Sequence, residues 1–183
     1  MTTIKKFKLT LAYDLDKEAV WLTEMSSKGF HFFKYSWFIY HFEEDHSKSY
    51  IYQTDFQKAD EEYFDLYADS GWEHVRTEMD SYHYFRADKE TIGDQRIYSD
   101  PASVKGMYQR MLMFYAILFI AVFAALVGLL VTWRPTYLSY FSLSIVSAVI
   151  VLYLLLFIQL IQKIYKYKKQ ANVKYLQLDS KPS

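Results

Sequence analysis

The amino-acid sequence predicts an α+β domain followed by a transmembrane α-helical hairpin. Two observations support this class. Two uncharged runs of about twenty residues, 112–131 and 138–160, lie close together in the second half of the chain. In the first half, the order strand, helix, strand, strand is predicted twice, and the strands are rich in Tyr, Phe and Trp.

The overall composition is consistent with two such parts and excludes several kinds of site. Hydrophobic residues make up 52% of the chain and aromatic residues 20%, which is more than an ordinary soluble domain contains. The chain has no Cys, which excludes disulfides, thiolate zinc sites and a cysteine nucleophile. The formal net charge is zero. Because no overall positive field is present, we expect no nucleic-acid partner.

The α+β domain is predicted to occupy residues 1–88 and to begin with one copy of the repeated unit. Asp16 and Glu18 suit the positive end of a helix dipole. Gly29 is predicted to end this helix in the left-handed conformation, which lets Phe30 pack back on the helix. The strand, helix and two strands of this copy are expected over 5–11, 16–28, 30–35 and 37–42.

A second copy of the same unit follows about 42 residues later. Gly71 and Trp72 repeat the Gly29 and Phe30 pair, and three acidic residues from Asp60 open the second helix. The strands of this copy are expected over 49–56, 72–77 and 81–85. We therefore predict a mostly antiparallel sheet with two helices on one face.

Several predicted strands are apolar on both sides, although a sheet covered on one face should alternate apolar and polar residues. A dimer, the membrane surface or a protein partner could cover the second face, and ordinary packing of strand aromatics is the alternative. The candidate interaction face comprises Phe33, Trp37, Ile39, His41, Ile51, His83 and Phe85.

The second half of the chain is predicted to form the membrane hairpin over residues 107–169. Each uncharged run is long enough to cross a hydrocarbon core of about 30 Å as a helix. The connection between the runs is so short that the two helices must be antiparallel, and Pro135 cannot continue the first helix unbroken. The expected segments are a polar linker over 89–106, spans over about 111–133 and 138–161, and a polar tail over 170–183.

Basic residues predict how the hairpin is oriented. Lys105 and Arg110 precede the first span and several lysines follow the second, whereas the connecting loop contains only Arg134. Because basic residues favour the cytoplasmic side, we expect a multi-pass protein of the cell membrane with both termini in the cytoplasm. The residues expected to contact lipid headgroups are Lys163, Lys166, Lys168 and Lys169.

No motif in the sequence specifies a reaction. The five glycines are isolated, so no nucleotide-binding loop is predicted, and neither Ser26 nor Ser27 lies in a nucleophile elbow. The five histidines lack the spacing of helical or finger-type metal sites. We therefore assign no catalytic, cofactor-binding or metal-binding residue, expect no cofactor, and do not favour an enzyme.

An ordered set of motifs resembles a known family. The set comprises Trp21–Leu22 with Gly29–Phe30, the strand 50–56, 66–72 and Tyr84–Phe85. It is similar to a bacterial domain-of-unknown-function family of two-pass membrane proteins, whose genes often lie beside PadR-type transcriptional regulators. The resemblance covers about residues 5–88. It implies the architecture, a bacterial origin and a regulatory setting, but no catalytic residues.

Three functional hypotheses follow. The first is a membrane-anchored cytoplasmic binding or regulatory module that engages a protein or a small ligand. The second is an accessory or immunity-type subunit of a larger membrane complex, and the third is a membrane-associated enzyme. The expected partners are the lipid bilayer and either another protein or further copies of the same chain.

Overall fold

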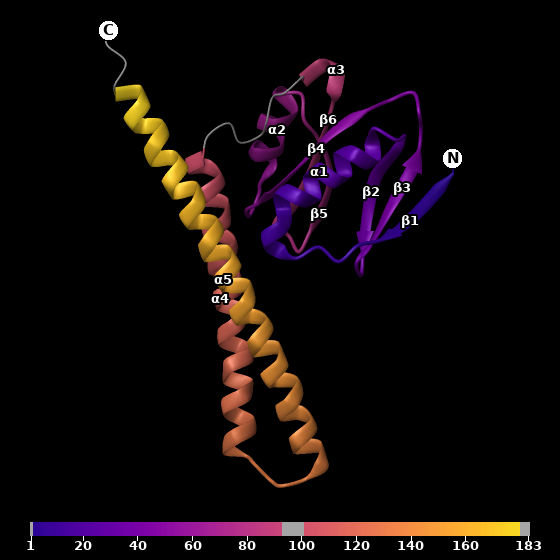
Figure 1. Cartoon of the computed structure of the whole chain (residues 1–183). Helices are drawn as coiled ribbons and strands as arrows, with labels where there is room; N and C mark the ends of the chain where they lie inside the picture. The colour runs from indigo at the N-terminus through magenta and orange to yellow at the C-terminus, as the bar shows by residue number, and fades with distance from the viewer. Residues whose placement is uncertain (1, 93–100, 180–183) are drawn as a thin grey trace. The chain divides into compact units, whose positions relative to one another are not determined.

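The structure is a computed structural model that describes residues 2–92 and 101–179. It divides into two compact units, Met1–Ser99 and Asp100–Ser183. Within the described residues, the first unit contains six strands and short helices, and the second contains two long apolar helices (Figure 1). The predicted class, an α+β domain followed by an apolar helical hairpin, is confirmed.

The first unit contains the same order of elements twice. The first copy consists of β1 (Thr3–Phe7), α1 (Leu15–Ser26), β2 (Phe30–Ser36) and β3 (Ile39–Glu44), with a 3-10 turn over Ala12–Asp14. The second copy consists of β4 (Tyr50–Phe56), α2 (Glu61–Asp69), β5 (Glu73–Glu78) and β6 (Tyr82–Asp88), followed by the short α3 (Lys89–Ile92).

Each copy forms its own antiparallel sheet, although a single sheet was predicted. The first sheet has the order β1-β3-β2 and the second has the order β4-β6-β5. In both sheets, therefore, the third strand of the copy lies between the first two. Both sheets also contain a register shift, between Phe32 and Lys34 in β2 and between His74 and Arg76 in β5.

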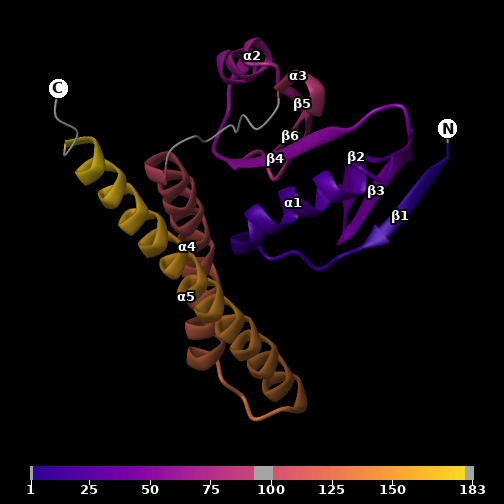
Figure 2. The same ribbon diagram turned by 45° about the horizontal axis from the view of Figure 1, so that its top comes forward.

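The two helices lie on opposite faces of the second sheet rather than on one face (Figure 2). Successive strand residues point to opposite faces. Accordingly, Tyr84 packs in a cluster with Leu22 and Met25 of α1, whereas Phe85 packs with Tyr63, Phe64 and Tyr67 of α2. The second sheet is thus covered by α1 on one face and by α2 on the other.

The main core joins α1 to the inner faces of both sheets. Its fully buried members include Leu22, Phe32 and Phe42. The ring of Phe32 in the first sheet lies 4.8 Å from the ring of Tyr84 in the second, measured between centroids. The inner face of the first sheet is therefore buried against α1 and the second sheet.

The glycines predicted after α1 and α2 both have a positive φ, although α1 ends at Ser26, two residues before the predicted end at Lys28. The φ angles are 82° at Gly29 and 83° at Gly71. After α2, the Trp72 N–H donates to the Tyr67 carbonyl at 2.9 Å and the Gly71 N–H donates to the Ala68 carbonyl at 2.9 Å. This pair of bonds is a Schellman motif, which requires the left-handed conformation that glycine adopts without strain.

The second unit is an antiparallel hairpin of α4 (Pro101–Val131) and α5 (Tyr137–Asp179). Both helices are long and apolar enough to cross a membrane. The ring of Phe119 lies 5.6 Å from that of Tyr153 and 5.5 Å from that of Phe157, which holds the two helices together. The Ser139 N–H donates to Thr136 Oγ1 at 3.3 Å, so Thr136 caps the start of α5.

The helices extend beyond the segments predicted from composition. Residues 101–106, expected in the linker, form the first turns of α4, and residues 170–179, expected in the tail, continue α5. Neither stretch contains an interior proline, and polar residues are compatible with a helix outside a membrane. The remaining parts of those two predicted segments, 93–100 and 180–183, lie outside the described residues.

Candidate functional site

The first sheet has an outer face that no other described element of the first unit covers. Alternation along β3 places Tyr40 and Phe42 in the core and Ile39 and His41 on the opposite face. On that outer face, Lys5 of β1 and Lys34 of β2 are both paired in register with His41. We call this surface, formed by Lys5, Phe7, Phe33, Lys34, Ile39 and His41, the basic-aromatic face.

The basic-aromatic face combines apolar area with positive charge. Phe7 is 74% exposed and is the register partner of Ile39. The ring of Phe33 lies 6.1 Å from that of His41. Partial burial and the charges of Lys5 and Lys34 lower the pKa of His41, so its imidazole is mainly neutral at pH 7 and the positive charge resides on the two lysines.

At one end of this face, the loop between β2 and β3 exposes two aromatic side chains. Trp37 is 88% exposed and Phe38 is 40% exposed. Both residues have a positive φ, 49° and 64°. The sequence had predicted both in a strand, because Trp and Phe favour strands. For residues other than glycine, the left-handed region costs about 1–2 kcal/mol each. Backbone strain of this kind is often found at functional sites.

The structure does not bring together all the residues predicted for the interaction face. Phe33, Trp37, Ile39 and His41 lie on or beside the basic-aromatic face. The other three, Ile51, His83 and Phe85, belong to the second sheet and lie under α2. His83 is 1% exposed and Phe85 is 0% exposed, so neither can contact a partner in this fold. Periodicity identified both as strand residues, but it could not show that α2 covers that face.

A buried carboxyl group connects the two sheets. Glu18 of α1 is 1% exposed. Tyr40 of β3 donates to its Oε1 at 2.5 Å, Tyr84 of β6 donates to the same oxygen at 2.8 Å, and Tyr82 of β6 donates to Oε2. Thr10 Oγ1 lies 3.0 Å from the Tyr40 hydroxyl. We call Glu18 and these three tyrosines the carboxyl-tyrosine cluster.

The cluster was not predicted, although the sequence contains a signal for it. Glu18 was interpreted as a helix-dipole residue, but it falls on the same helical stripe as Leu15, Leu22 and Met25, which are all buried. Burial raises the pKa of the Glu18 carboxyl, while the three phenol hydrogen bonds and the charge of Lys8 oppose that rise. Glu18, Tyr40 and Tyr84 are buried and Tyr82 is partly buried, so the evident role of the cluster is to tie α1 to both sheets.

The histidines pair locally and do not converge. Within the described residues, no group of three His, Asp or Glu side chains could hold a metal ion. His83 Nε2 lies 2.8 Å from the Gln57 carbonyl and therefore carries a proton, so His83 Nδ1 accepts from Thr77 Oγ1 at 2.8 Å. Thr77 Oγ1 in turn lies 2.8 Å from His74 Nε2. Burial lowers the pKa of both histidines, in agreement with this neutral chain of hydrogen bonds.

Ser26 contacts a histidine but is built into the interior. Its Oγ lies 2.9 Å from His31 Nδ1, and His31 Nε2 lies 2.7 Å from the Asp45 carbonyl. The Tyr50 N–H donates to the same Ser26 Oγ at 2.7 Å, and Ser26 is 0% exposed. Together with Thr23, which accepts from the Tyr52 N–H at 2.9 Å, Ser26 satisfies the free edge of β4. The Ser26 hydroxyl therefore serves as a hydrogen-bond acceptor for the edge of β4, and it is not a nucleophile exposed to substrate.

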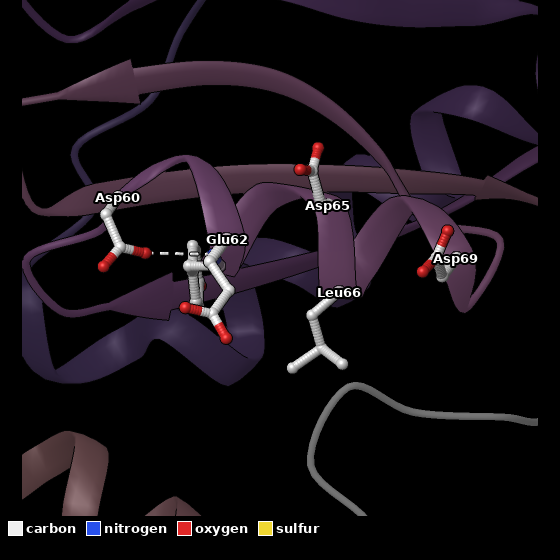
Figure 3. Close-up of a pocket in the computed structure, with 6 residues that line it drawn as sticks. Asp60, Glu62, Asp65, Leu66 and Asp69 are labelled. Carbon is white, nitrogen blue, oxygen red and sulfur yellow. Dashed lines mark hydrogen bonds between the residues drawn. The ribbon is translucent and has the colours of Figure 1, made fainter.

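An acidic hollow of about 420 Å³ lies along α2 (Figure 3). Its carboxyl groups point in different directions around the exposed Leu66, and the Asp60 carboxylate accepts from the Tyr63 N–H at 3.0 Å as the helix cap. A divalent cation needs several oxygens directed at one point. This arrangement does not provide that geometry.

The four lysines expected at lipid headgroups all lie on α5. Lys163 is half-buried, with its Nζ 3.4 Å from the Tyr108 hydroxyl of α4, whereas Lys166, Lys168 and Lys169 are exposed. Tyr108 also stacks on Tyr167, with ring centroids 5.8 Å apart. Aromatic and basic residues thus occupy this end of the hairpin, as is common at a membrane interface.

The fold and these sites define a class of protein: an α+β domain with one open basic-aromatic face, joined to two candidate membrane-spanning helices. The chain belongs to the family described as "Protein of unknown function (DUF2812)", which it matches over residues 14–120. The match covers more than half of the chain and extends from the start of α1 into α4. No curated protein and no solved structure matches the chain.

Proposed function

We propose that this protein is a membrane-anchored binding module. In this proposal, the first unit engages an anionic partner through the basic-aromatic face, and the α4–α5 hairpin holds that unit at the membrane. The main support for the proposal is that other elements cover both faces of the second sheet but only one face of the first. The second sheet is covered on both faces, whereas the first leaves Phe7, Phe33 and Ile39 without a covering element among the described residues of the first unit. Exposed apolar patches of this kind are typical of interaction sites.

The charge of the face supports an anionic partner over a second copy of the chain. A twofold dimer through this face would bring Lys5 and Lys34 of one copy close to the same lysines of the other. Like charges in such an interface oppose association. The outer face of β3 has one acidic residue, Glu43. It is paired in register with Thr3, four positions along β1 from Phe7, so it lies at the end of the strand away from the exposed aromatic residues.

The proposal includes an orientation and a regulatory role. Basic residues at the outer ends of both apolar helices favour a cytoplasmic first unit and an external loop around Arg134. The cytoplasmic leaflet is the one that presents anionic lipid, and anionic protein segments are also available there. A regulatory role would fit a family whose genes often lie beside PadR-type transcriptional regulators.

A site-specific photocrosslinker at Phe33 tests the binding proposal. In the full-length chain in native membranes, we expect a discrete crosslinked product, either protein or lipid. The product should be lost in Lys5→Glu, Lys34→Glu because the face would then repel an anionic partner. The matched control carries the crosslinker at Asp65, which is exposed on α2. Equal products at both positions, or products that survive the charge reversal, would contradict the proposal.

Cysteine labelling tests the orientation, since the chain has no Cys of its own. In intact cells, Thr136→Cys should react with an impermeant reagent, and Lys48→Cys should react only after the membrane is opened. If Lys48→Cys reacts in intact cells, the first unit lies outside and no cytoplasmic partner can reach it.

A further inference from the structure

The loop between β2 and β3 uses residues that do not suit its geometry. It has two residues with positive φ, Trp37 and Phe38, and such two-residue hairpin loops favour Asn-Gly. Among the described residues of the first unit, Trp37 is nevertheless the most exposed aromatic residue. Because a better turn sequence is readily available, the aromatic side chains themselves are the feature that needs an explanation.

The equivalent loop in the second copy provides an internal comparison. Met79 and Asp80 also both have a φ of 53°, so each loop has two consecutive non-glycine residues in the left-handed region, although three residues separate the register partners Glu78 and Tyr82. The second loop, however, presents a carboxylate at Asp80 and follows Glu78. The aromatic pair therefore belongs to the first loop and is not imposed by the fold.

Further apolar and basic groups surround the first loop. The Lys8 N–H donates to the Phe38 carbonyl at 3.0 Å, which fixes the end of β1 beside the loop. Phe7 and Leu9 flank that lysine and are 74% and 61% exposed. The next outward-facing residue along β3 after Ile39 is His41, which is paired in register with Lys5 and Lys34. This row of three residues lies two positions from Ile39, a distance of about 7 Å along the strand.

We propose that this end of the first unit docks on the surface of an anionic bilayer. In this arrangement, the membrane–water interface receives the side chains of Trp37, Phe38, Phe7 and Leu9. The lipid headgroups are contacted by Lys5 and Lys34. This inference rests on the proposed function and names its partner. The distance of about 7 Å between the aromatic loop and the two lysines matches the depth of the interfacial region of a bilayer. Trp is enriched in that region, and lysines bind anionic lipid there.

The anchor is the reason to prefer a bilayer over an acidic protein segment. The first unit continues directly into a unit with two helices apolar enough to cross a membrane. A tethered surface is present at a high effective concentration, so even a weak interfacial contact is populated. An acidic protein would have to compete with that surface for the same lysines.

The test uses the full-length chain in lipid nanodiscs with a fluorophore at Leu9→Cys. Discs of equal parts phosphatidylcholine and phosphatidylglycerol are compared with discs of phosphatidylcholine alone, and both contain lipids brominated near the headgroup as quenchers. We expect strong quenching in the anionic discs at low salt and weaker quenching at high salt, because salt screens the lysines. The control fluorophore is at Lys48→Cys, which lies beyond the opposite end of β3 and should not be quenched.

Three sets of variants separate docking from folding. Trp37→Asn with Phe38→Gly should abolish the quenching and at the same time raise the midpoint of denaturation, because it installs the preferred turn sequence. The same change in the second loop, Met79→Asn with Asp80→Gly, should raise the midpoint and leave the quenching intact. Lys5→Ala and Lys34→Ala should each lower the docking equilibrium about fivefold at low salt.

Equal quenching in neutral and anionic discs, or none in either, would overturn the bilayer proposal. If quenching is absent while the crosslink from Phe33 to a protein persists, the binding module stands and its partner is an acidic protein. If differently labelled copies transfer energy to one another in the discs, the face is an interface between copies, and both proposals fail.

Discussion

The two sheets of the first unit share one strand order but differ in what covers them. The second sheet lies between α1 and α2, and its Phe85 is 0% exposed. The first sheet packs one face on α1 and leaves the other open, with Phe7 at 74% exposure. Similar aromatic strands are therefore buried on both faces in one sheet and left partly exposed on one face in the other. The composition of a strand alone does not distinguish the two cases.

The largest expected effect comes from truncating one phenylalanine in each sheet. Phe85→Ala should lower the free energy of unfolding by about 3–5 kcal/mol, because it leaves a cavity under α2. Phe33→Ala should change it by less than about 1 kcal/mol, since that side chain is already partly solvated. Urea denaturation of the full-length chain in mild detergent measures both. Equal losses would show that the outer face of the first sheet is covered after all.

A second variant tests the link between the sheets. Glu18→Ala should lower the free energy of unfolding by about 3 kcal/mol, because three phenol hydroxyls lose their common acceptor in the interior. Glu24→Ala, on the exposed side of the same helix, is the matched control and should have little effect. A small loss for Glu18→Ala would mean that the tyrosines find other partners.

The pH dependence of stability tests the ionisation of the same carboxyl. Burial raises the pKa of Glu18 above its ordinary value of 4.5, so the folded state binds this proton more tightly than the unfolded state. Its contribution to stability is complete below about pH 4.5 and is lost as pH rises through the folded pKa, by at most about 1.4 kcal/mol per pH unit. Glu18→Gln should remove this slope, which denaturation midpoints across pH 4–8 can measure. An unchanged slope would assign it to another group.

The smallest expected effect is at the edge of β4, where helix hydroxyls replace a neighbouring strand. Thr23→Val keeps the shape of the side chain but removes the acceptor for the Tyr52 N–H. The loss should be about 1 kcal/mol, with faster hydrogen exchange at the Tyr52 amide. Ser27→Ala, where the hydroxyl bonds only to the carbonyl of Glu24 in its own helix, is the control. Unchanged exchange at Tyr52 would show that the hydroxyl is not needed there.

Local patterns were sufficient to predict much of this architecture. The uncharged runs predicted both long apolar helices, since such runs are stable only in a membrane or a large core. The glycines at 29 and 71 predicted the helix ends, because the left-handed conformation disfavours other residues. The spacing of about 42 residues predicted that the first unit contains two copies of one order of strands and helix. Each of these features depends on residues close together in the chain.

Only the tertiary structure decided which surfaces remain open and which polar groups are buried. His83 and Trp37 were both interpreted as parts of one aromatic face, but α2 covers His83 whereas Trp37 is 88% exposed in a turn. Glu18 was interpreted as a residue that suits the helix dipole, whereas in the structure its carboxyl accepts from Tyr40, Tyr82 and Tyr84. The hydrogen bonds of Glu18 join residues 22–66 positions apart, and the α2 rings that cover His83 are 19 and 20 positions away from it. Such contacts form only when the sheets and helices pack, so neither periodicity nor propensity contains them.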